Sequence, residues 1–367
     1  NIGTRRLFGD LGRLETRAEK QLEKWLDEQI DIAIEKGDYT VSLNSISSTL
    51  YEVINDCLER KKDKLVSWIF NSPSVKIGEL KIQKEEFENT KQLKCKFLCE
   101  KNEKIDSIEI RCGNKGFVTS LNDKKLYRNF LLNGIISAVL DIPFNNSLSI
   151  NSLRNANIYV PAARTGFMLT KDIVNKVGRD NTFNMQSEIE DEIQITPFTK
   201  PINQFIDEIC GLNTEHEQSI KTKELADMIE KEMTYGSVDI SNLTSKEIRY
   251  YPEGLSESKP LRVASAVVTE LSPLILLFKH RPYIDSVFYE EPEMGLHPQL
   301  QQKMGKILVE TINTGIRIVS TTHSDIILQH INNMIKLKKH SECKKICDKL
   351  EYTDKDLLDE TQVKVYQ

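Results

Sequence analysis

The chain has 367 residues, of which 39% are hydrophobic and 29% are charged. This composition supports a buried core under a solvated surface, and it excludes collagen, low-complexity and wholly disordered chains. The formal net charge is −5, so no overall positive field draws the chain to nucleic acid. At about 150 residues per domain, the length predicts two or three structural units.

Neither export nor membrane insertion is indicated by the sequence. The longest apolar region, 130–144, is interrupted by Asn133 and Asp141 and is too short to cross a bilayer. The first residues have no apolar signal-peptide core. Seven scattered cysteines fit a reducing compartment better than a disulfide scaffold. We therefore expect a cytoplasmic protein that makes no membrane contact.

The N-terminal part of the chain predicts helices followed by an antiparallel sheet. Apolar residues spaced three to four apart predict helix through residues 10–70, so segment 1–72 is helical. Segment 73–150 is predicted to form an antiparallel β subdomain and a helix near 125–140. Alternation with a period of two marks its strands at 75–82, 93–99 and 105–112.

The pattern changes after residue 150. A short buried strand at 156–161 is predicted within segment 151–169. Residues 170–235 are polar, charged and helix-favouring, which predicts an inserted helical arm with little core. Segment 236–367 begins with a predicted hairpin and then alternates helices with strands, so the predicted fold class is α/β.

Two adjacent carboxylates, Glu290 and Glu291, follow a short apolar strand at 284–289. In an open α/β sheet, ligands bind beyond the carboxyl ends of the strands, which places this pair where a nucleotide would lie. One carboxylate can hold a hydrated Mg²⁺, and its neighbour can orient the attacking water. A solvated acidic turn is the alternative, since Glu85 and Glu86 show how easily such a pair arises.

The next predicted strand, 316–320, leads into Thr321, Thr322 and His323. We expect His323 to lie at the same edge of the sheet as the glutamate pair. A histidine at that position can donate to a phosphate oxygen and respond to the loss of the phosphate. The alternative is a buried core histidine.

The stretch EEPEMGLHP at 290–298, together with STTHS at 320–324, resembles the Walker B, D-loop and switch-histidine motifs of ABC-type ATPase heads. The likeness is to the soluble branch that includes SMC/RecF-like, OLD-family and anti-phage defence ATPases, and it covers residues 245–367 well. It implies an ABC-type P-loop ATPase head that uses ATP and Mg²⁺. In that head Glu290 holds the metal, Glu291 and His323 are catalytic, and His297 of the D-loop lies at the nucleotide.

Two further segments resemble that branch. LRVASAVVTEL at 261–271 stands at the place of the ABC signature, where Ser265 would contact the γ-phosphate held by a second protomer. Ala266 and Val267 depart from the Gly or Ser usual there, which weakens this contact. IYVPAARTG at 158–166 resembles a strand–Pro–Ala–x–Arg segment, in which Arg164 either faces phosphate or braces the helical arm.

The sequence contains no G-x-x-x-x-G-K-[ST] loop. A complete head would carry this P-loop before the helical segment 1–72. Because the chain begins without Met, we expect the P-loop segment to be missing from this chain and to precede Asn1. A degenerate ATPase is the alternative.

The resemblance leaves three functions open. The leading hypothesis is the ATPase of a Septu-type, retron-associated anti-phage system, a homodimer or higher homo-oligomer that regulates an HNH-type nuclease subunit. An OLD-family nuclease is the second; its Toprim domain would lie outside this chain, because no Toprim-like acidic cluster follows His323. An SMC-like DNA-tethering ATPase is the third. Nucleic acid, either DNA or retron RNA and DNA, is a further candidate partner.

Overall fold

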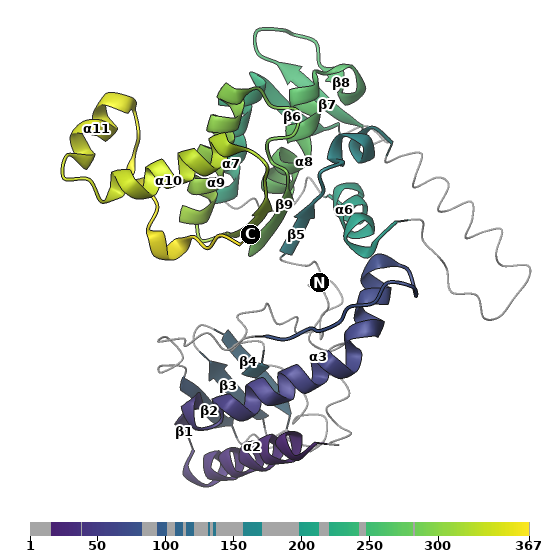
Figure 1. Cartoon of the computed structure of the whole chain (residues 1–367), viewed down its shortest axis with the longest axis vertical. Coiled ribbons are helices and arrows are strands. Elements are labelled where there is room, and N and C mark those ends of the chain that lie inside the picture. The colour runs from purple at the N-terminus through teal and green to yellow at the C-terminus, as the bar shows by residue number, and fades with distance from the viewer. Residues whose placement is uncertain are drawn as a thin grey trace, which may run out of the picture. The chain divides into compact units, whose positions relative to one another are not determined.

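In the computed structural model the chain forms two units, Asn1–Asn155 (unit 1) and Ala156–Gln367 (unit 2), and Figure 1 labels most of their helices and strands. We describe each unit by itself. The structure describes residues 16–37, 39–82, 94–100, 107–112, 115–120, 131–132, 135–136, 157–170, 198–212, 220–241, 247–281 and 283–366.

Unit 1 combines two helices, α2 (Arg17–Lys36) and α3 (Ser47–Phe70), with a four-stranded antiparallel sheet of order β1-β2-β3-β4. The sheet strands are β1 (Tyr39–Ser42), β2 (Lys94–Glu100), β3 (Ser107–Cys112) and β4 (Lys115–Ser120). The two helices and the strands predicted at 93–99 and 105–112 are confirmed. Helix over the whole of 10–70 is wrong at 39–42, where β1 pairs with β2, and neither β1 nor β4 was expected as a strand. The helix predicted near 125–140 lies mostly outside the described residues. The core of the unit includes Leu22, Leu26, Ile30, Leu50 and Ile54.

The start of α2 shows why the helix begins where it does. The Thr16 hydroxyl accepts the Glu19 N–H at 3.2 Å, and the Glu19 carboxylate accepts the Thr16 N–H at 3.0 Å, which completes a capping box. Gly37, at φ 79°, ends the helix in a conformation that suits glycine. Glu19 also forms an ion pair with Arg60 of α3, so one buried carboxylate holds both helices.

The strand predicted at 75–82 is wrong, because residues 71–82 run beside α3 without joining a sheet. The Asn55 side chain of α3 accepts the Ile82 N–H at 2.8 Å and donates to the Ile82 carbonyl at 3.2 Å. A side-chain amide thus takes the place of a neighbouring strand. The alternating apolar residues of this segment do face the protein interior, since Leu80 and Ile82 pack against the core of unit 1.

Unit 2 contains a parallel sheet of order β10-β9-β5. Its strands are β5 (Asn157–Val160), β9 (Ser286–Glu290) and β10 (Arg317–Thr321), which confirms the predicted strands and the α/β fold class. One face is buried in the core through residues such as Val160, Val287 and Tyr289. On the other face Phe288 and Val319, which are partners in the register, remain 43% and 56% exposed.

The helix α8 (Ala266–His280) is the most deeply buried helix among the described parts of unit 2, with buried residues on all sides from Val268 onward. Within the described residues no helix is both long enough and apolar enough to cross a bilayer, and α8 itself has only 15 residues. The other elements are α6 (Lys200–Cys210), α7 (Ile220–Ile229), the π-helical turn η4 (Glu230–Thr234), β6 (Gly236–Ile240), β7 (Ile248–Pro252), β8 (Lys259–Pro260), η5 (Leu261–Val263), α9 (Pro298–Asn313), α10 (Asp325–Lys338) and α11 (Cys343–Leu350).

The prediction of an inserted arm with little core over 170–235 needs correction. Residues 171–197 and 213–219 of this segment lie outside the described residues. The helices α6 and α7, however, contribute Phe205 and Ile229 to the same core as α8 and the parallel sheet. Most residues of these helices are polar, but a narrow apolar stripe on each packs into that core. The two helices are therefore part of the α/β unit.

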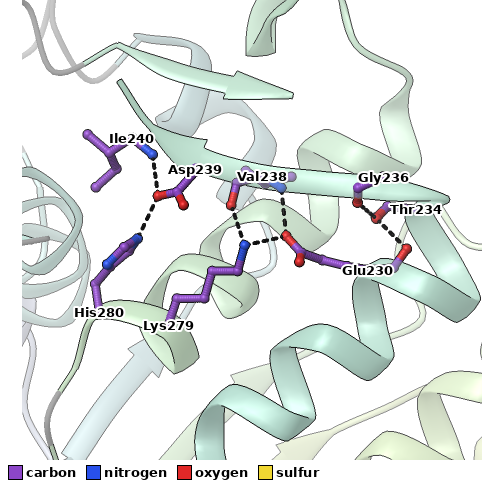
Figure 2. Close-up of polar contacts among 8 residues, drawn as sticks. All are labelled: Glu230, Thr234, Gly236, Val238, Asp239, Ile240, Lys279 and His280. Carbon is purple, nitrogen blue, oxygen red and sulfur yellow. Dashed lines mark hydrogen bonds and ion pairs between the residues drawn. The ribbon is translucent and has the colours of Figure 1, made fainter. Parts of the chain in front are cut away.

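Three consecutive basic residues end α8, and each is paired with an acid from a different element. Lys279 lies 2.7 Å from Glu230 of η4, and His280 lies 2.9 Å from Asp239 of β6 (Figure 2). Arg281 lies 3.0 Å from Glu208 of α6. Basic side chains are favourable at the negative end of a helix dipole. Removing one partner of a buried pair, such as Lys279 with Glu230, costs about 3–5 kcal/mol. These contacts therefore hold the C-terminal end of α8 in place.

A buried acidic pair joins α9 to the C-terminal segment. Glu310 of α9 lies beside Asp356 of the short helix η6 (Asp354–Asp356). Lys306 lies 3.8 Å from the Glu310 carboxylate and 3.7 Å from that of Asp356. Burial, assisted by the negative charge of Asp356 and opposed by Lys306, raises the pKa of Glu310 to about 7. The folded chain thus binds a proton at Glu310 more tightly than the unfolded chain does.

This shift predicts a pH dependence of stability. A raised folded-state pKa stabilises the fold most below the unfolded value of 4.5, and the stabilisation is lost as the pH rises through about 7. As the pH rises from 6 to 8, the melting temperature of Glu310→Gln should therefore fall less than that of wild type. The difference should be about 2–4 °C for each kcal/mol of stability that the Glu310 proton contributes. Glu342→Gln, at an exposed ion pair with Lys345, should keep the wild-type slope. Equal slopes for Glu310→Gln and wild type would refute this role of Glu310.

Candidate functional site

The glutamate pair and His323 come from neighbouring strand ends. Glu290 is the register partner of Thr321 in the parallel pair of β9 and β10, and His323 follows two residues after Thr321. The Glu291 N–H donates to the Thr321 carbonyl at 2.9 Å. The expected adjacency of the two strands is confirmed, and the chemical roles of the three residues remain predictions.

The Glu290 carboxylate is oriented by the strand on its other side. Its Oε2 atom accepts the Ala162 N–H at 3.2 Å, just beyond the end of β5. The Tyr159 hydroxyl lies near Glu290, and burial together with this carboxylate raises the pKa of Tyr159. Tyr159 therefore stays protonated beside the Glu290 carboxylate. The first carboxylate of the pair is held between strands, with its side chain only partly buried.

Glu291 has a left-handed backbone with φ 43°. This conformation costs a non-glycine residue roughly 1–2 kcal/mol, and it turns the side chain out of the strand alternation. Its carbonyl accepts the Met294 N–H at 3.0 Å, which forms the turn after β9. Among the described residues its carboxylate has no hydrogen-bond partner, so it remains able to bind a water molecule.

Arg164 is fully buried, with 0% of its surface exposed. Its guanidinium donates to the carbonyls of Pro161, Glu290 and Glu291 at 3.0–3.2 Å. A guanidinium enclosed by carbonyls cannot also face a bound phosphate. The expectation that Arg164 binds phosphate is therefore corrected, and the alternative of a bracing role fits, with the strand-end turn as the part that it braces.

Glu270 of α8 is the counterion of Arg164. The carboxylate lies 2.8 Å from the Arg164 Nε and accepts the Thr165 hydroxyl at 2.6 Å. Gly295, at φ 69°, passes over it so closely that a Cβ there would lie 3.0 Å from the Glu270 Cγ. Helix α8, the turn after β5 and the turn after β9 therefore meet at the buried carboxylate of Glu270.

Glu293 joins the loop after β9 to the loop after β10. Its carboxylate accepts the His323 N–H at 2.6 Å and the Thr322 hydroxyl at 2.8 Å. Ser324 then caps α10 by accepting the Ile327 N–H at 3.2 Å. The backbone of His323 is thereby fixed, while its side chain remains exposed.

Ser265 and His297 lie at helix starts. Ser265 is the exposed N-cap of α8 and accepts the Val268 N–H at 3.4 Å. His297 is the N-cap of α9, where it is exposed and makes no side-chain cap bond. Among the described residues neither side chain hydrogen-bonds the glutamate pair or His323. The structure therefore unites Glu290, Glu291, Arg164 and the His323 backbone, and leaves Ser265 and His297 on the surface.

Sequence reasoning missed Tyr159, Glu270 and Glu293 as parts of the site. A signal was present for Glu270, because a lone acid in an otherwise apolar helix predicts a buried partner. Tyr159 and Glu293 carry no such signal. The place of Tyr159 in the site depends on which strand lies beside β9. The contacts of Glu293 depend on how the loops after β9 and β10 fold.

Comparison with known protein families covers part of the site. Residues 204–329, about a third of the chain, match the family model described as "AAA domain, putative AbiEii toxin, Type IV TA system". The matched region contains both strand ends of the site, and Arg164 precedes it. The match supports an ATPase of this general type, and the α/β unit with its parallel sheet fits an ABC-type ATPase head. No curated protein matches the chain.

Solved structures of SMC ATPase heads are similar to this chain at low levels. A structure from work on ATP-driven dimerisation and DNA-stimulated activation of SMC ATPases is 14% identical, over 29% of this chain and 70% of the other, with a TM-score of 0.24. An SMC head bound to the C-terminal winged-helix domain of ScpA is 10% identical, over 65% and 68%, with a TM-score of 0.27. These TM-scores are too low for either structure to define the function of this chain.

The contact between Glu293 and His323 predicts a local change in backbone protection. Glu293→Ala removes the acceptor of the His323 N–H, so hydrogen exchange at that amide should accelerate about tenfold or more, as for a lost hydrogen bond of roughly 1.5–3 kcal/mol. Glu291→Gln is the matched control, because the Glu291 side chain makes no described bond to this loop. Unchanged exchange at His323 in Glu293→Ala would show that the carboxylate does not hold the loop.

Proposed function

We propose that this chain is the head of an ATPase in which the ends of β9 and β10 form the hydrolytic edge of the nucleotide site. The observation that carries the proposal is the parallel pairing of these strands. It places two consecutive carboxylates next to the loop that holds an exposed histidine. Strand carboxyl ends are where open α/β sheets bind ligands.

The residues at this edge fit Mg²⁺. Among the described residues no three His, Cys, Asp or Glu side chains cluster as a metal site. Mg²⁺ retains waters and is commonly bound by one or two carboxylates together with substrate phosphates. Glu290 would hold it through a carboxylate already oriented by the Ala162 N–H. When bound, the metal would neutralise phosphate charge.

Glu291 and His323 then have distinct roles in the proposed reaction. The carboxylate of Glu291, which has no hydrogen-bond partner among the described residues, accepts a proton from the water that attacks the γ-phosphate. His323 donates a hydrogen bond to a phosphate oxygen, from a loop whose backbone Glu293 holds. Both residues act at the outer end of the sheet, where their side chains reach solvent.

A second copy of the chain is proposed to complete the site. Ser265 is exposed at the start of α8, and the free N–H groups of a helix start favour bound phosphate. His297, exposed at the start of α9, is proposed to lie near the same interface. Ala266 and Val267 stand where the signature usually has Gly or Ser, so the proposed head-to-head dimer is expected to be weak.

The biological setting is a finer proposal, supported by the resemblance of the 290–298 and 320–324 motifs to defence ATPases. On that basis the dimer regulates an HNH-type nuclease subunit in an anti-phage system, with nucleic acid as a candidate signal. Co-purification of the full-length protein with its genomic neighbours tests this directly. A partner with a Toprim domain, or no nuclease partner at all, would contradict it.

The role of Glu291 predicts a selective loss of turnover. Glu291→Gln in the full-length protein should retain ATP binding and lose ATP hydrolysis by on the order of a hundredfold or more, as expected for removal of a general base. Binding is measured with a fluorescent ATP analogue and turnover by phosphate release. Wild-type turnover in this variant would show that Glu291 is not the base.

The role of Ser265 predicts a loss of assembly. Ser265→Arg should bind ATP normally but fail to dimerise with ATP, because a long cation replaces a small exposed cap at the proposed interface. Light scattering of Glu291→Gln with and without ATP, in the presence and absence of Ser265→Arg, measures this. Arg262→Ser, three residues away and exposed, is the control. ATP-dependent dimers of normal stability in Ser265→Arg would contradict the head-to-head arrangement.

A further inference from the structure

The turn that presents Glu291 is under local backbone strain. Glu291 lies at φ 43°, in a region that residues with a Cβ seldom adopt. Such a conformation persists only where surrounding contacts over-determine it. The contacts that hold this backbone therefore also decide where the Glu291 carboxylate points.

Three hydrogen bonds hold the N–H and the carbonyl of Glu291. Two are backbone bonds: the Glu291 N–H donates to Thr321, and its carbonyl accepts the Met294 N–H at 3.0 Å. The third comes from a side chain, because the Arg164 Nη2 donates to the same carbonyl at 3.1 Å. The Arg164 Nη1 also donates to the preceding carbonyl, that of Glu290, at 3.0 Å. One rigid guanidinium thus spans the two peptide units at which the strand turns into the left-handed residue.

The orientation of Arg164 is itself fixed. Glu270 pairs with its Nε at 2.8 Å, and the Tyr289 ring lies under the guanidinium, with Cζ 5.0 Å from the ring centroid. Arginine presents a planar fork of donors, whereas lysine presents a single point charge. A lysine at position 164 therefore cannot bridge both carbonyls and also bind Glu270.

We propose that Arg164, held by Glu270, is a positioning residue for ATP hydrolysis: it fixes the strained backbone of Glu291 and thereby aims the Glu291 carboxylate. This inference rests on the proposed function. Because Glu270 belongs to α8, whose first residues are the proposed contact to a second protomer, the same ion pair links that helix to the catalytic turn.

The test is a double-mutant cycle in the full-length protein. Arg164→Lys should lower kcat for ATP about tenfold or more, since a misplacement of about 1 Å can cost a hundredfold, with KM changed less than about twofold. In a Glu291→Gln background, Arg164→Lys should cause no further loss of the single-turnover rate, because the residue through which it acts is already disabled.

Glu230→Gln is the matched control. It breaks another buried ion pair of α8, that with Lys279 at the far end of the helix (Figure 2), and should lower the melting temperature while leaving kcat unchanged. Glu270→Gln, which keeps the side-chain shape, is the second test variant and should lower kcat by a smaller factor than Arg164→Lys. It carries the test if Arg164→Lys does not fold.

The outcomes separate this inference from the proposed function. If wild type hydrolyses no ATP, the proposed function fails and the inference falls with it. If wild type hydrolyses ATP but kcat is unchanged in Arg164→Lys, or its loss multiplies with that of Glu291→Gln, only the positioning role is overturned. Failure of both Arg164→Lys and Glu270→Gln to fold would show a purely structural pair and also overturn it.

Discussion

The buried ion pair between Arg164 and Glu270 is the contact on which the site depends. When β9 ends in a left-handed residue, the carbonyls of Glu290 and Glu291 leave the regular pattern of the sheet, and Arg164 supplies their donors. A fully buried cation needs a counterion, because an unpaired buried charge costs several kcal/mol. Glu270 provides that counterion from α8. The strand turn and the central helix are therefore fixed by a single requirement of charge balance.

The other end of α8 follows the same logic. Lys279, His280 and Arg281 lie where the helix dipole is negative, and acids from η4, β6 and α6 pair with them. Between these two polar ends the helix is apolar on all sides and fills the centre of unit 2. The helix is thus held at both ends, while its N-cap residue, Ser265, reaches solvent. A rigid helix with an exposed start would suit the proposed role of linking a contact with a second protomer to the turn that presents Glu291.

Much of this edge could be predicted from sequence because it depends on local patterns. Short apolar strands that end in Glu290 and near His323 indicate the chemistry, and parallel strands place their ends at one edge. The burial of Arg164 could not be predicted in the same way, because its partners are backbone carbonyls, which carry no residue signature. The strand expected at 75–82 failed for a similar reason: the Asn55 side chain takes the backbone bonds of Ile82 that a neighbouring strand would have taken. Helix is predicted correctly for α6 and α7, but their packing into the core is not, because their apolar stripe is narrow and their partners are distant in sequence.

The central claim is that the nucleotide lies against the ends of β9 and β10. A crystal structure of the full-length protein with Mg²⁺ and a non-hydrolysable ATP analogue tests it most directly. The account predicts the metal next to the Glu290 carboxylate, directly or through one water, and the γ-phosphate within reach of Glu291 and the His323 ring. It also predicts Arg164 in its present contacts, without a bond to phosphate. A nucleotide bound elsewhere, or Arg164 drawn out to the phosphate, would contradict the account.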